Sequence, residues 1–202
     1  MIRAIIICAG SVVDYGYIGT FVREGDMVIC ADGGFEHARK MGCRPDVIVG
    51  DMDSLGELPQ DTKIVRFPTK KDLTDTEIAV QYAITNGATE VILLGAIGSR
   101  MDHSMTNILM MINVPCSVTI VDENQKITLV NSHIDINERI GTVVSLVPLT
   151  RVSGIVTRGL EYPLDNESLE VGFGRGVSNI VTSKDAAVSL KSGKLLLVVN
   201  RY

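Results

Sequence analysis

The first 122 residues alternate between short, continuously apolar runs and segments in which apolar residues recur at helical spacing. The runs are RAIIIC, MVICA, DVIVG, KIVRF, EVILLG and SVTIV. Because they are apolar at consecutive positions, they predict strands that are covered on both faces, as in a parallel sheet. The segments between them predict three helices, at Phe35–Met41, Thr74–Asn86 and Met101–Asn113. This alternation predicts an α/β domain with a mostly parallel, doubly wound sheet.

The pattern changes after about Glu123. The later apolar segments are KITLVN, HIDINE, TVVSLVPL, VSGIVTRG, SLEVGF, VSNIVTS, AAVSLK and KLLLVVN, with turn residues such as Asn-Ser and Ser-Gly between them. Since these segments are short and show no useful helical period, they predict an all-β sandwich or barrel. We therefore expect two domains, with residues 1–122 forming the α/β domain and residues 123–202 the all-β domain.

The composition narrows the class of protein. The chain of 202 residues is 46% hydrophobic and carries a formal net charge of -5, which argues against general nucleic-acid binding, because that needs a basic face. Its four cysteines lack C-x-x-C spacing and predict free thiols in a reducing compartment. The apolar run in MIRAIIICAG is too short for a signal peptide, and no later run is long enough to span a bilayer. We therefore expect a cytoplasmic protein without membrane contact.

Carboxylates follow four successive predicted strands at the point where each strand ends. They are Asp32 after MVICA, Asp51 and Asp53 after DVIVG, Asp72 and Asp75 after KIVRFPTKK, and Asp102 after EVILLGAIGSR. Since ligands of an open parallel sheet bind at the carboxyl ends of its strands, we expect these six side chains on one rim. Glycines accompany them, including Gly33 and Gly34, and would let a ligand approach the backbone closely.

Each of these carboxylates has an ordinary alternative explanation. A single Asp after a strand often belongs to a turn or caps a helix, and Thr74 with Glu77 resembles a capping box. Six carboxylates together would raise one another's pKa values unless cations compensated them. Mg²⁺ prefers such hard oxygen ligands, and Arg100, Lys70 and Lys71 on the same rim are suited to phosphate oxygens. The set therefore predicts a metal-dependent phosphoryl-type transfer without a P-loop.

Other candidates carry less weight. The CAGS segment after the first strand predicts either a plain turn or a contact with nucleotide. His103 either orients a carboxylate or faces solvent in the first turn of a helix, and His37 and His133 have no evident partners. In the third predicted helix, Ile108, Met111 and Ile112 form an apolar stripe. Met105, Met110 and Met111 predict helix packing rather than a cofactor pocket.

Several blocks together resemble the thiamine pyrophosphokinase family. They are ADGGFEHA, PDVIVGDMDS, KKDLTDTEIA, GSRMDHSMTNI, GLEYPLDNESL and GRGVSNIV, in the order found in that family. The resemblance implies an N-terminal α/β domain and a C-terminal β-sandwich. It also implies transfer of the pyrophosphoryl group of ATP to the hydroxyl of thiamine, with Mg²⁺ and with release of AMP. The family forms homodimers in which thiamine lies between the first domain of one chain and the second domain of the other.

The resemblance assigns ligands to residues of this chain. Asp51 and Asp53 fall on the family's G-D-x-D-S motif, and Asp72 and Asp75 fall on its D-x-T-D motif. It therefore implies that these four carboxylates hold Mg²⁺. The implied contacts of ATP are Asp32, Gly33, Gly34, Lys71, Arg100 and His103.

The remaining motifs imply the acceptor site and the chemistry. Thiamine is expected near Ser178 and Asn179, which match the family's S-N motif. The implied catalytic residues are Asp53, Asp75, Arg100 and Asp102, the last two in the R-x-D-H motif. The family commonly has two glycines before this arginine, whereas this chain has Gly98 and Ser99, and a positive φ at Ser99 would be strained.

The implied mechanism is an in-line attack of the thiamine hydroxyl on the β-phosphorus of ATP. Arg100 and Lys71 would neutralise charge on the transferred group, and Asp75 or Asp102 would take the hydroxyl proton. Three alternatives stay open. Metal-dependent nucleotide-sugar transferases also carry a D-x-D segment after a strand, a pyrophosphokinase acting on a pterin alcohol would differ only in its acceptor pocket, and a nucleotide or thiamine-phosphate binding module would not catalyse transfer.

Overall fold

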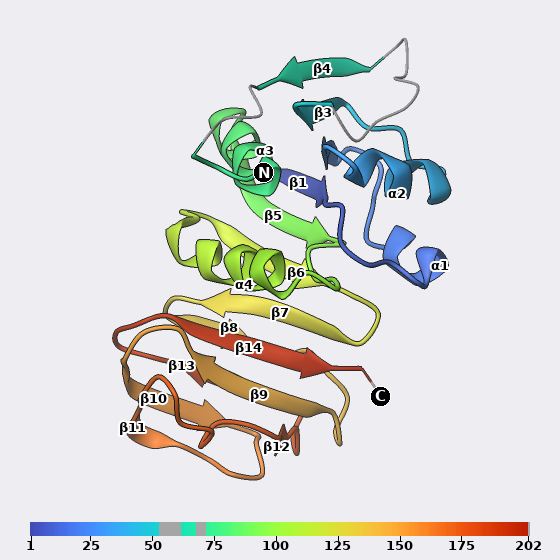
Figure 1. The fold of residues 1–202 in the computed structure, drawn as a ribbon. Helices are drawn as coiled ribbons and strands as arrows, with labels where there is room; N and C mark the ends of the chain where they lie inside the picture. The colour runs from blue at the N-terminus through green and yellow to red at the C-terminus, as the bar shows by residue number, and fades with distance from the viewer. Residues whose placement is uncertain (53–61, 68–71, 202) are drawn as a thin grey trace. The chain divides into compact units, whose positions relative to one another are not determined.

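The computed structural model describes residues 1–52, 62–67 and 72–201. The chain divides into two compact units, Met1–Glu123 and Asn124–Tyr202 (Figure 1). The first unit combines strands and helices, whereas the second is built from strands. In the part of the chain that is described, no helix is long and apolar enough to cross a membrane.

Six strands of the first unit pair in parallel. They are β1 (Ile2–Ile7), β2 (Met27–Ala31), β3 (Val47–Gly50), β4 (Lys63–Arg66), β5 (Ala88–Leu94) and β6 (Ser117–Val121), in the order β6-β5-β1-β2-β3-β4. The chain thus places β2 to β4 on one side of β1 and then returns to place β5 and β6 on the other side. The order in which strands are added therefore reverses between β1 and β5, and the carboxyl ends of these two strands lie side by side. Open parallel sheets bind ligands at such a reversal point.

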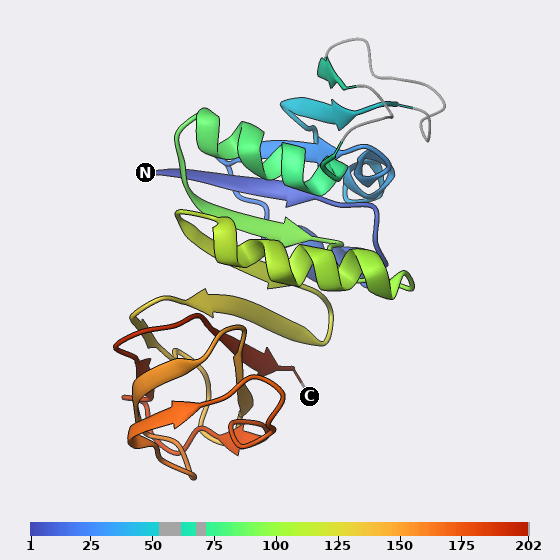
Figure 2. The same cartoon turned by 60° about the vertical axis from the view of Figure 1, so that its left-hand side comes forward.

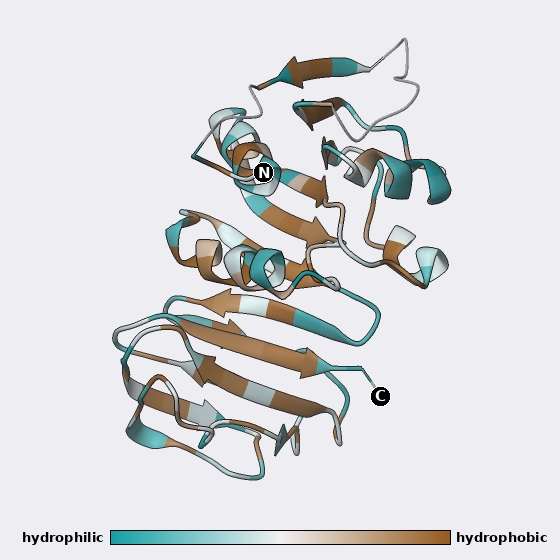
Figure 3. Cartoon of the chain, viewed as in Figure 1, coloured by the Kyte–Doolittle hydropathy of each residue, from teal (hydrophilic) through white to brown (hydrophobic). Residues whose placement is uncertain are grey.

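The central strands are covered on both faces, as their apolar runs predicted. Ala4, Ile5, Ile6 and Ile7 of β1 are each 0% exposed, and the strands are the most hydrophobic segments of the unit (Figure 3). Strand β4 is different, because its four residues are exposed or only partly buried. The expectation of cover on both faces is therefore wrong for KIVRF, which within the described residues is an edge strand paired with β3 alone.

In the described part of the first unit, four α-helices follow or precede these strands along the chain. They are α1 (Tyr15–Gly19), α2 (Gly34–Lys40), α3 (Asp75–Thr85) and α4 (Met101–Met110), the last continued by the short 3-10 helix η1 (Met111–Asn113). Ile18 of α1 and Ala38 of α2 belong to one hydrophobic cluster with Ile5 and Ile7 of β1. Figure 2 shows α3 and α4 side by side along the strands. Helix α1 has only five residues, too few to show a helical period, and the sequence did not predict it.

Helix α4 buries a face different from the one that its apolar residues predicted. The buried residues of the helix are Ser104, Asn107 and Met110, whereas Met105 is 53% exposed. The expected packing of Met105 is therefore wrong, while Met110 and Met111 are buried as expected. The reason is that the side chains of Ser104 and Asn107 form hydrogen bonds with the backbone of the turn after β5. The helix therefore directs these polar side chains, and not Met105, toward the interior.

The second unit contains two antiparallel sets of strands. They are β7 (Gln125–Val130), β8 (His133–Asp135), β9 (Val143–Pro148), β10 (Val152–Arg158), β11 (Asp165–Leu169), β12 (Asn179–Ile180), β13 (Ala187–Ser189) and β14 (Leu195–Asn200). The order is β12-β9-β14-β7 in one set and β11-β10-β13-β8 in the other, and residues of both sets share one hydrophobic cluster. The predicted all-β half is thus confirmed as a mostly antiparallel β unit. The predicted strand SLEVGF is wrong at its end, because β11 stops at Leu169 and a turn follows.

Candidate active site

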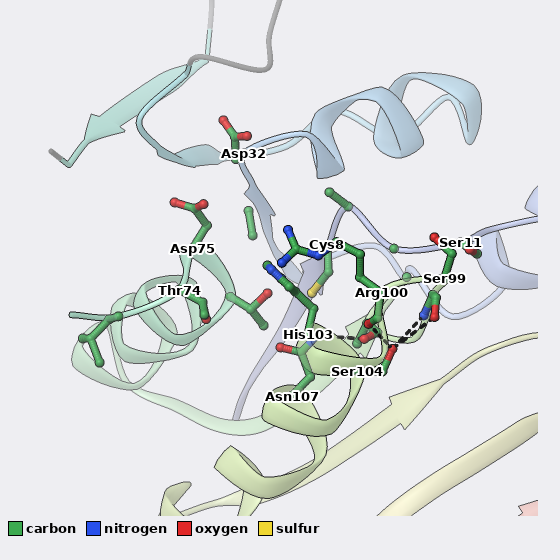
Figure 4. A pocket seen from close by; sticks show the side chains of 18 of the residues that line it. Cys8, Ser11, Asp32, Thr74, Asp75, Ser99, Arg100, His103, Ser104 and Asn107 are labelled. Atoms are coloured by element: carbon green, nitrogen blue, oxygen red, sulfur yellow. Dashed lines mark hydrogen bonds between the residues drawn. The ribbon is translucent and has the colours of Figure 1, made fainter. Parts of the chain in front are cut away.

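A cavity of about 590 Å³ opens at the carboxyl ends of the strands in the first unit. Its walls are residues 8–11 after β1, Asp32 after β2, Asp51 after β3, residues 95, 96 and 98–100 after β5, and the first turns of α3 and α4 (Figure 4). It therefore lies where the strand order reverses, beside β1 and β5. The volume is typical of sites for small molecules.

Three carboxylates from three different chain segments line this cavity, those of Asp32, Asp51 and Asp75. Asp32 is only 9% exposed, and within the described part of the chain its Oδ1 has no hydrogen-bond partner. A buried carboxylate oxygen without a partner is costly, and a bound cation or a donor on a ligand removes that cost. Asp32 packs closely against Gly50, because a Cβ on Gly50 would lie 2.8 Å from the Cβ of Asp32. Asp32 itself has a φ of 42°.

Arg100 and Asp102 form an exposed ion pair at the start of α4. The guanidinium donates from Nε to Oδ1 at 3.2 Å and from Nη2 to Oδ2 at 2.6 Å. These hydrogen bonds raise the pKa of Arg100 and lower the pKa of Asp102. Arg100, a cation two residues away, compensates the charge of Asp102, so the rise in pKa that was expected only for uncompensated carboxylates does not occur there. Arg100 and His103 belong to the cavity wall.

Two side chains of α4 form hydrogen bonds with the backbone of the turn after β5. Ser104 Oγ accepts from the backbone N–H of Gly98 at 3.0 Å, and Asn107 Nδ2 donates to the carbonyl of Ala96 at 2.7 Å. A Cβ on Gly98 would lie 2.9 Å from the backbone nitrogen of Ser11, so the turn and the segment after β1 pack backbone to backbone. Among the described residues other than glycine, positive φ angles occur at Asp32, Met52, Asn166 and Ser178. The expected strain at Ser99 is thus absent.

Cys8 lies in the same wall but is not suited to act as a nucleophile. It is free, like the other three cysteines, and it is 2% exposed. Burial raises the pKa of its thiol to about 12, which keeps the sulfur protonated at neutral pH. The chemistry of this cavity therefore depends on its carboxylates and basic groups.

Comparison with known families matches both units. Residues 19–128 match the model of the thiamin pyrophosphokinase catalytic domain, and residues 131–196 match that of the thiamin pyrophosphokinase vitamin B1 binding domain. The chain belongs to the thiamine pyrophosphokinase family. The resemblance carried by the sequence motifs and the enzyme class that it implied are thereby confirmed.

Individual relatives agree with this assignment. The chain is 31% identical to thiamine pyrophosphokinase 3 of Oryza sativa subsp. japonica, and the match covers 76% of this chain and 65% of that protein. It is 29% identical to thiamin pyrophosphokinase 1 of Caenorhabditis elegans, and the match covers 76% of this chain and 68% of that protein. The crystal structure of thiamin pyrophosphokinase from Geobacillus thermodenitrificans has a TM-score of 0.83 at 25% identity and covers 100% of this chain and 98% of its own. The thiamine pyrophosphokinase structure from Bacillus subtilis has a TM-score of 0.88 at 20% identity, with 99% of both chains covered, and supports the fold.

The family motifs are brought together only in part. Asp32, Asp51, Asp75, Arg100 and His103 line one cavity. The predicted residues Asp53, Lys70 and Lys71 lie outside the described residues. Asp72 and Asp102 are described and exposed, and neither belongs to the cavity wall.

The two glycines of the ADGG motif lie at the start of α2. Gly33 is the N-cap of this helix and Gly34 its first residue. A Cβ on Gly34 would lie 1.9 Å from the carbonyl oxygen of Ile7, so this glycine lets the helix pack directly on the backbone of β1. Close packing of α2 on β1 therefore requires glycine at position 34.

The S-N motif lies in the second unit, at the start of β12. Ser178 has a φ of 60°, and its N–H donates to Ser145 Oγ at 3.0 Å. Asn179 is 5% exposed, and its side-chain amide bonds to the backbone N–H and carbonyl of Tyr162 at 3.0 and 2.8 Å. The amide of Asn179 thus holds the backbone of Tyr162, whose side chain is 62% exposed.

Sequence reasoning missed several residues of the site. Ser104 and Asn107 belong to the GSRMDHSMTNI motif, but the sequence indicated no role for either of them. The CAGS segment, for which the sequence predicted either a turn or a nucleotide contact, forms a wall of the cavity. The expectation that His37 and His133 lack partners is wrong. His37 bonds to Tyr15 and to the Gly10 carbonyl, and His133 bonds to Ser189 and Asp135. Three of these contacts join residues at least 22 positions apart, so no local sequence signal identifies them, whereas the contact of His133 with Asp135 joins residues two positions apart on β8.

Proposed function

We propose that this chain transfers the pyrophosphoryl group of ATP to the hydroxyl of thiamine, giving thiamine pyrophosphate and AMP. The observation that carries the proposal is the cavity beside β1 and β5, which three carboxylates line together with Arg100 and His103 in a chain of this family. Carboxylates and basic groups at the reversal point of a parallel sheet are suited to a metal-bound triphosphate. In this proposal the first unit has the doubly wound arrangement.

The proposed division of labour follows the two domains. Residues 1–122 would bind ATP and Mg²⁺ and carry the catalytic groups, and residues 123–202 would form the thiamine-binding β-sandwich. Asp32, Gly33, Gly34, Lys71, Arg100 and His103 are the proposed contacts of ATP, and Ser178 and Asn179 mark the thiamine site. The match of residues 131–196 to a vitamin B1 binding domain supports the second assignment.

The donor set of the cavity fits Mg²⁺. Within the described residues, no three His, Cys, Asp or Glu side chains are gathered into a complete metal site. Mg²⁺ needs fewer, since it is commonly held by one or two carboxylates together with phosphate oxygens and water. The carboxylate oxygens of Asp51 and Asp75, which line the cavity, are ligands of the right kind. We propose that Asp51, Asp53, Asp72 and Asp75 hold the ion, which when bound neutralises phosphate charge.

The remaining chemistry belongs to the side chains of the chain itself. The thiamine hydroxyl attacks the β-phosphorus in line, and Arg100 and Lys71 neutralise the charge that develops on the transferred group. Asp75 and Asp102 are the proposed acceptors of the hydroxyl proton, and Arg100 lowers the pKa of Asp102, which makes that carboxylate a weaker base. Asp102 also serves to orient Arg100.

Two further parts of the proposal concern the setting of the enzyme. We propose that the chain acts as a homodimer in which thiamine lies between the first domain of one chain and the second domain of its partner. We also propose a cytoplasmic location, which is supported by four free cysteines without a disulfide among them.

The proposal is tested by incubating the protein with ATP and Mg²⁺, with and without thiamine, and separating the products by chromatography. AMP and thiamine pyrophosphate formed only when both substrates are present would support it. ADP as the product would mean transfer of a single phosphoryl group, and turnover with a pterin alcohol or a nucleotide sugar in place of thiamine would support the other transferases. Asp53→Asn is expected to abolish product formation, and full activity of this variant would contradict the assigned metal ligands.

A further inference from the structure

The segment that follows β1 forms a wall of the proposed nucleotide cavity, and its backbone is bonded on two sides. Toward β5, the N–H of Gly10 donates to the carbonyl of Gly95 at 2.7 Å, and the N–H of Ser11 donates to the carbonyl of Ile97 at 2.9 Å. On the other side, His37 of α2 bonds through Nε2 to the carbonyl oxygen of Gly10 at 2.9 Å.

These bonds hold both ends of a single peptide plane. The carbonyl of Gly10 and the N–H of Ser11 belong to the same planar peptide unit. His37 hydrogen-bonds to the carbonyl and Ile97 accepts from the N–H, so the plane is bonded on opposite sides. Glycine leaves such a plane free to rotate, because it has no Cβ to restrict φ and ψ. Gly10 cannot be replaced by a more restricted residue, since a Cβ would lie 2.3 Å from the oxygen of Gly95. Hydrogen bonds must therefore fix the orientation of this plane.

The protonation of the His37 ring follows from its two partners. A carbonyl oxygen only accepts, so Nε2 carries the hydrogen and donates to Gly10. Nδ1 lies 2.9 Å from the hydroxyl oxygen of Tyr15 and, in the neutral ring, accepts from that hydroxyl. The Tyr15 ring in turn lies under Lys40 Nζ, 5.3 Å from the ring centroid. Tyr15 therefore orients the imidazole that hydrogen-bonds to the carbonyl of Gly10.

We propose that His37 is a positioning residue for nucleotide binding, which fixes the Gly10–Ser11 peptide plane and thereby the Ser11 wall of the cavity, with Tyr15 holding its ring. The inference rests on the proposed function in placing ATP in this cavity. It assigns His37 no contact with ATP and no part in proton transfer. Its effect belongs to the affinity for ATP and leaves the affinity for thiamine unchanged.

Three variants test this proposal. His37→Leu removes the donor to Gly10 at similar side-chain volume, His37→Gln keeps an N–H donor at the end of the side chain, and Tyr15→Phe removes only the hydroxyl that orients the ring. His133→Leu is the matched control, because His133 also makes two side-chain hydrogen bonds but lies in the second unit. The KM for ATP, the KM for thiamine and kcat are measured for each variant.

We expect His37→Leu to raise the KM for ATP about five- to tenfold, the effect of one lost hydrogen bond, with the KM for thiamine unchanged. His37→Gln should stay within about threefold of the wild type, and Tyr15→Phe should lie between the two. His133→Leu should leave the KM for ATP unchanged. An unchanged KM for ATP in His37→Leu, or an equal loss in His37→Leu and His37→Gln, would overturn the proposal. If His37→Leu does not fold, the KM for ATP of Tyr15→Phe decides: a rise supports the proposal and an unchanged value overturns it.

A binding measurement separates this proposal from the proposed function. Calorimetry with Mg²⁺ and the non-hydrolysable analogue α,β-methylene ATP reports nucleotide affinity without any turnover. A weaker affinity in His37→Leu that His37→Gln restores supports the positioning role even if thiamine is not the acceptor. An identical affinity in the wild type and His37→Leu overturns it even if thiamine pyrophosphate is formed.

Discussion

Arg100 places a permanent positive charge in the wall of the cavity. It lines the cavity, and its two hydrogen bonds to Asp102 fix the plane of the guanidinium. A planar guanidinium held in this way can present its remaining donors to phosphate oxygens in a fixed direction. At the scale of single residues, the R-x-D spacing therefore places a carboxylate where it orients the guanidinium of Arg100 before a ligand binds.

Replacing Arg100 by Gln is expected to lower kcat by roughly 10² to 10³, because a donor aimed at charge that develops in the transition state is lost. Thiamine pyrophosphate formation at saturating ATP and thiamine measures this effect. Arg39→Gln provides the control, since Arg39 also pairs with a carboxylate, that of Glu36, but lies on α2 away from the cavity wall. A kcat of Arg100→Gln within threefold of the wild type would contradict the assigned role.

At the scale of elements, local signals decide where helix α3 begins. Thr74 Oγ1 accepts from the N–H of Glu77 at 3.2 Å, and the Glu77 carboxylate accepts from the N–H of Thr74 at 2.8 Å. The capping box predicted from the sequence is thus confirmed. It also determines the position of Asp75, which is the first residue of this helix and lines the cavity (Figure 4).

Thr74→Ala is expected to destabilise the fold by about 1 kcal/mol, the usual effect of losing an N-cap side chain. Thr74→Ser keeps the capping oxygen and should stay close to the wild type. The free energy of unfolding in urea measures both variants. Equal stability of Thr74→Ala and the wild type would show that the cap does not determine the start of the helix.

The loop between β1 and α1 is held by a carboxylate at the end of the first unit. Glu123 Oε1 accepts from the N–H of Val13 at 2.5 Å and from the N–H of Asp14 at 3.0 Å. Burial acts to raise the pKa of Glu123, but the hydrogen bonds from these backbone groups and its own N–H lower it overall. The ionised carboxylate is therefore favoured in the folded state.

The sign of the pH dependence follows from this lowered pKa. The stabilisation by Glu123 is fully present above the ordinary pKa of a glutamate, about 4.3, and is lost as the pH falls through the lower pKa of the folded state. Glu123→Gln should therefore be less stable than the wild type at pH 6 to 7, and the difference should shrink below about pH 4.3. Urea unfolding of both proteins from pH 3 to pH 7 measures it. A difference that grows toward low pH would contradict this account.

At the scale of the whole molecule, the proposed sharing of the active site between two chains gives a further prediction. Asp75→Asn damages the first domain and Asn179→Ala the second, so each variant alone should be nearly inactive. When the two variants are mixed and allowed to exchange subunits, each mixed dimer regains one site with both halves intact. Activity should then rise to about a quarter of the wild-type value per chain, given random pairing. If each site belonged to a single chain, the mixture would stay as inactive as the separate variants.

The sequence by itself determined the elements with strong local signals. The continuous apolar runs located the six strands of the first unit, the Thr74 to Glu77 spacing located the start of α3, and the motifs identified the family. These features depend on neighbouring residues, because burial on both faces of a strand and the capping of a helix require particular residue types at short spacing.

The tertiary structure decided which of these residues meet. It brings Asp32, Asp51 and Asp75 to one cavity and leaves Asp72 and Asp102 outside its walls, although all five follow predicted strands. It also joins His37 to Gly10, 27 residues away, and turns the polar face of α4 toward the loop after β5. The physical reason is that such contacts depend on strand order and helix rotation, which follow from the packing of the whole unit and not from local sequence spacing.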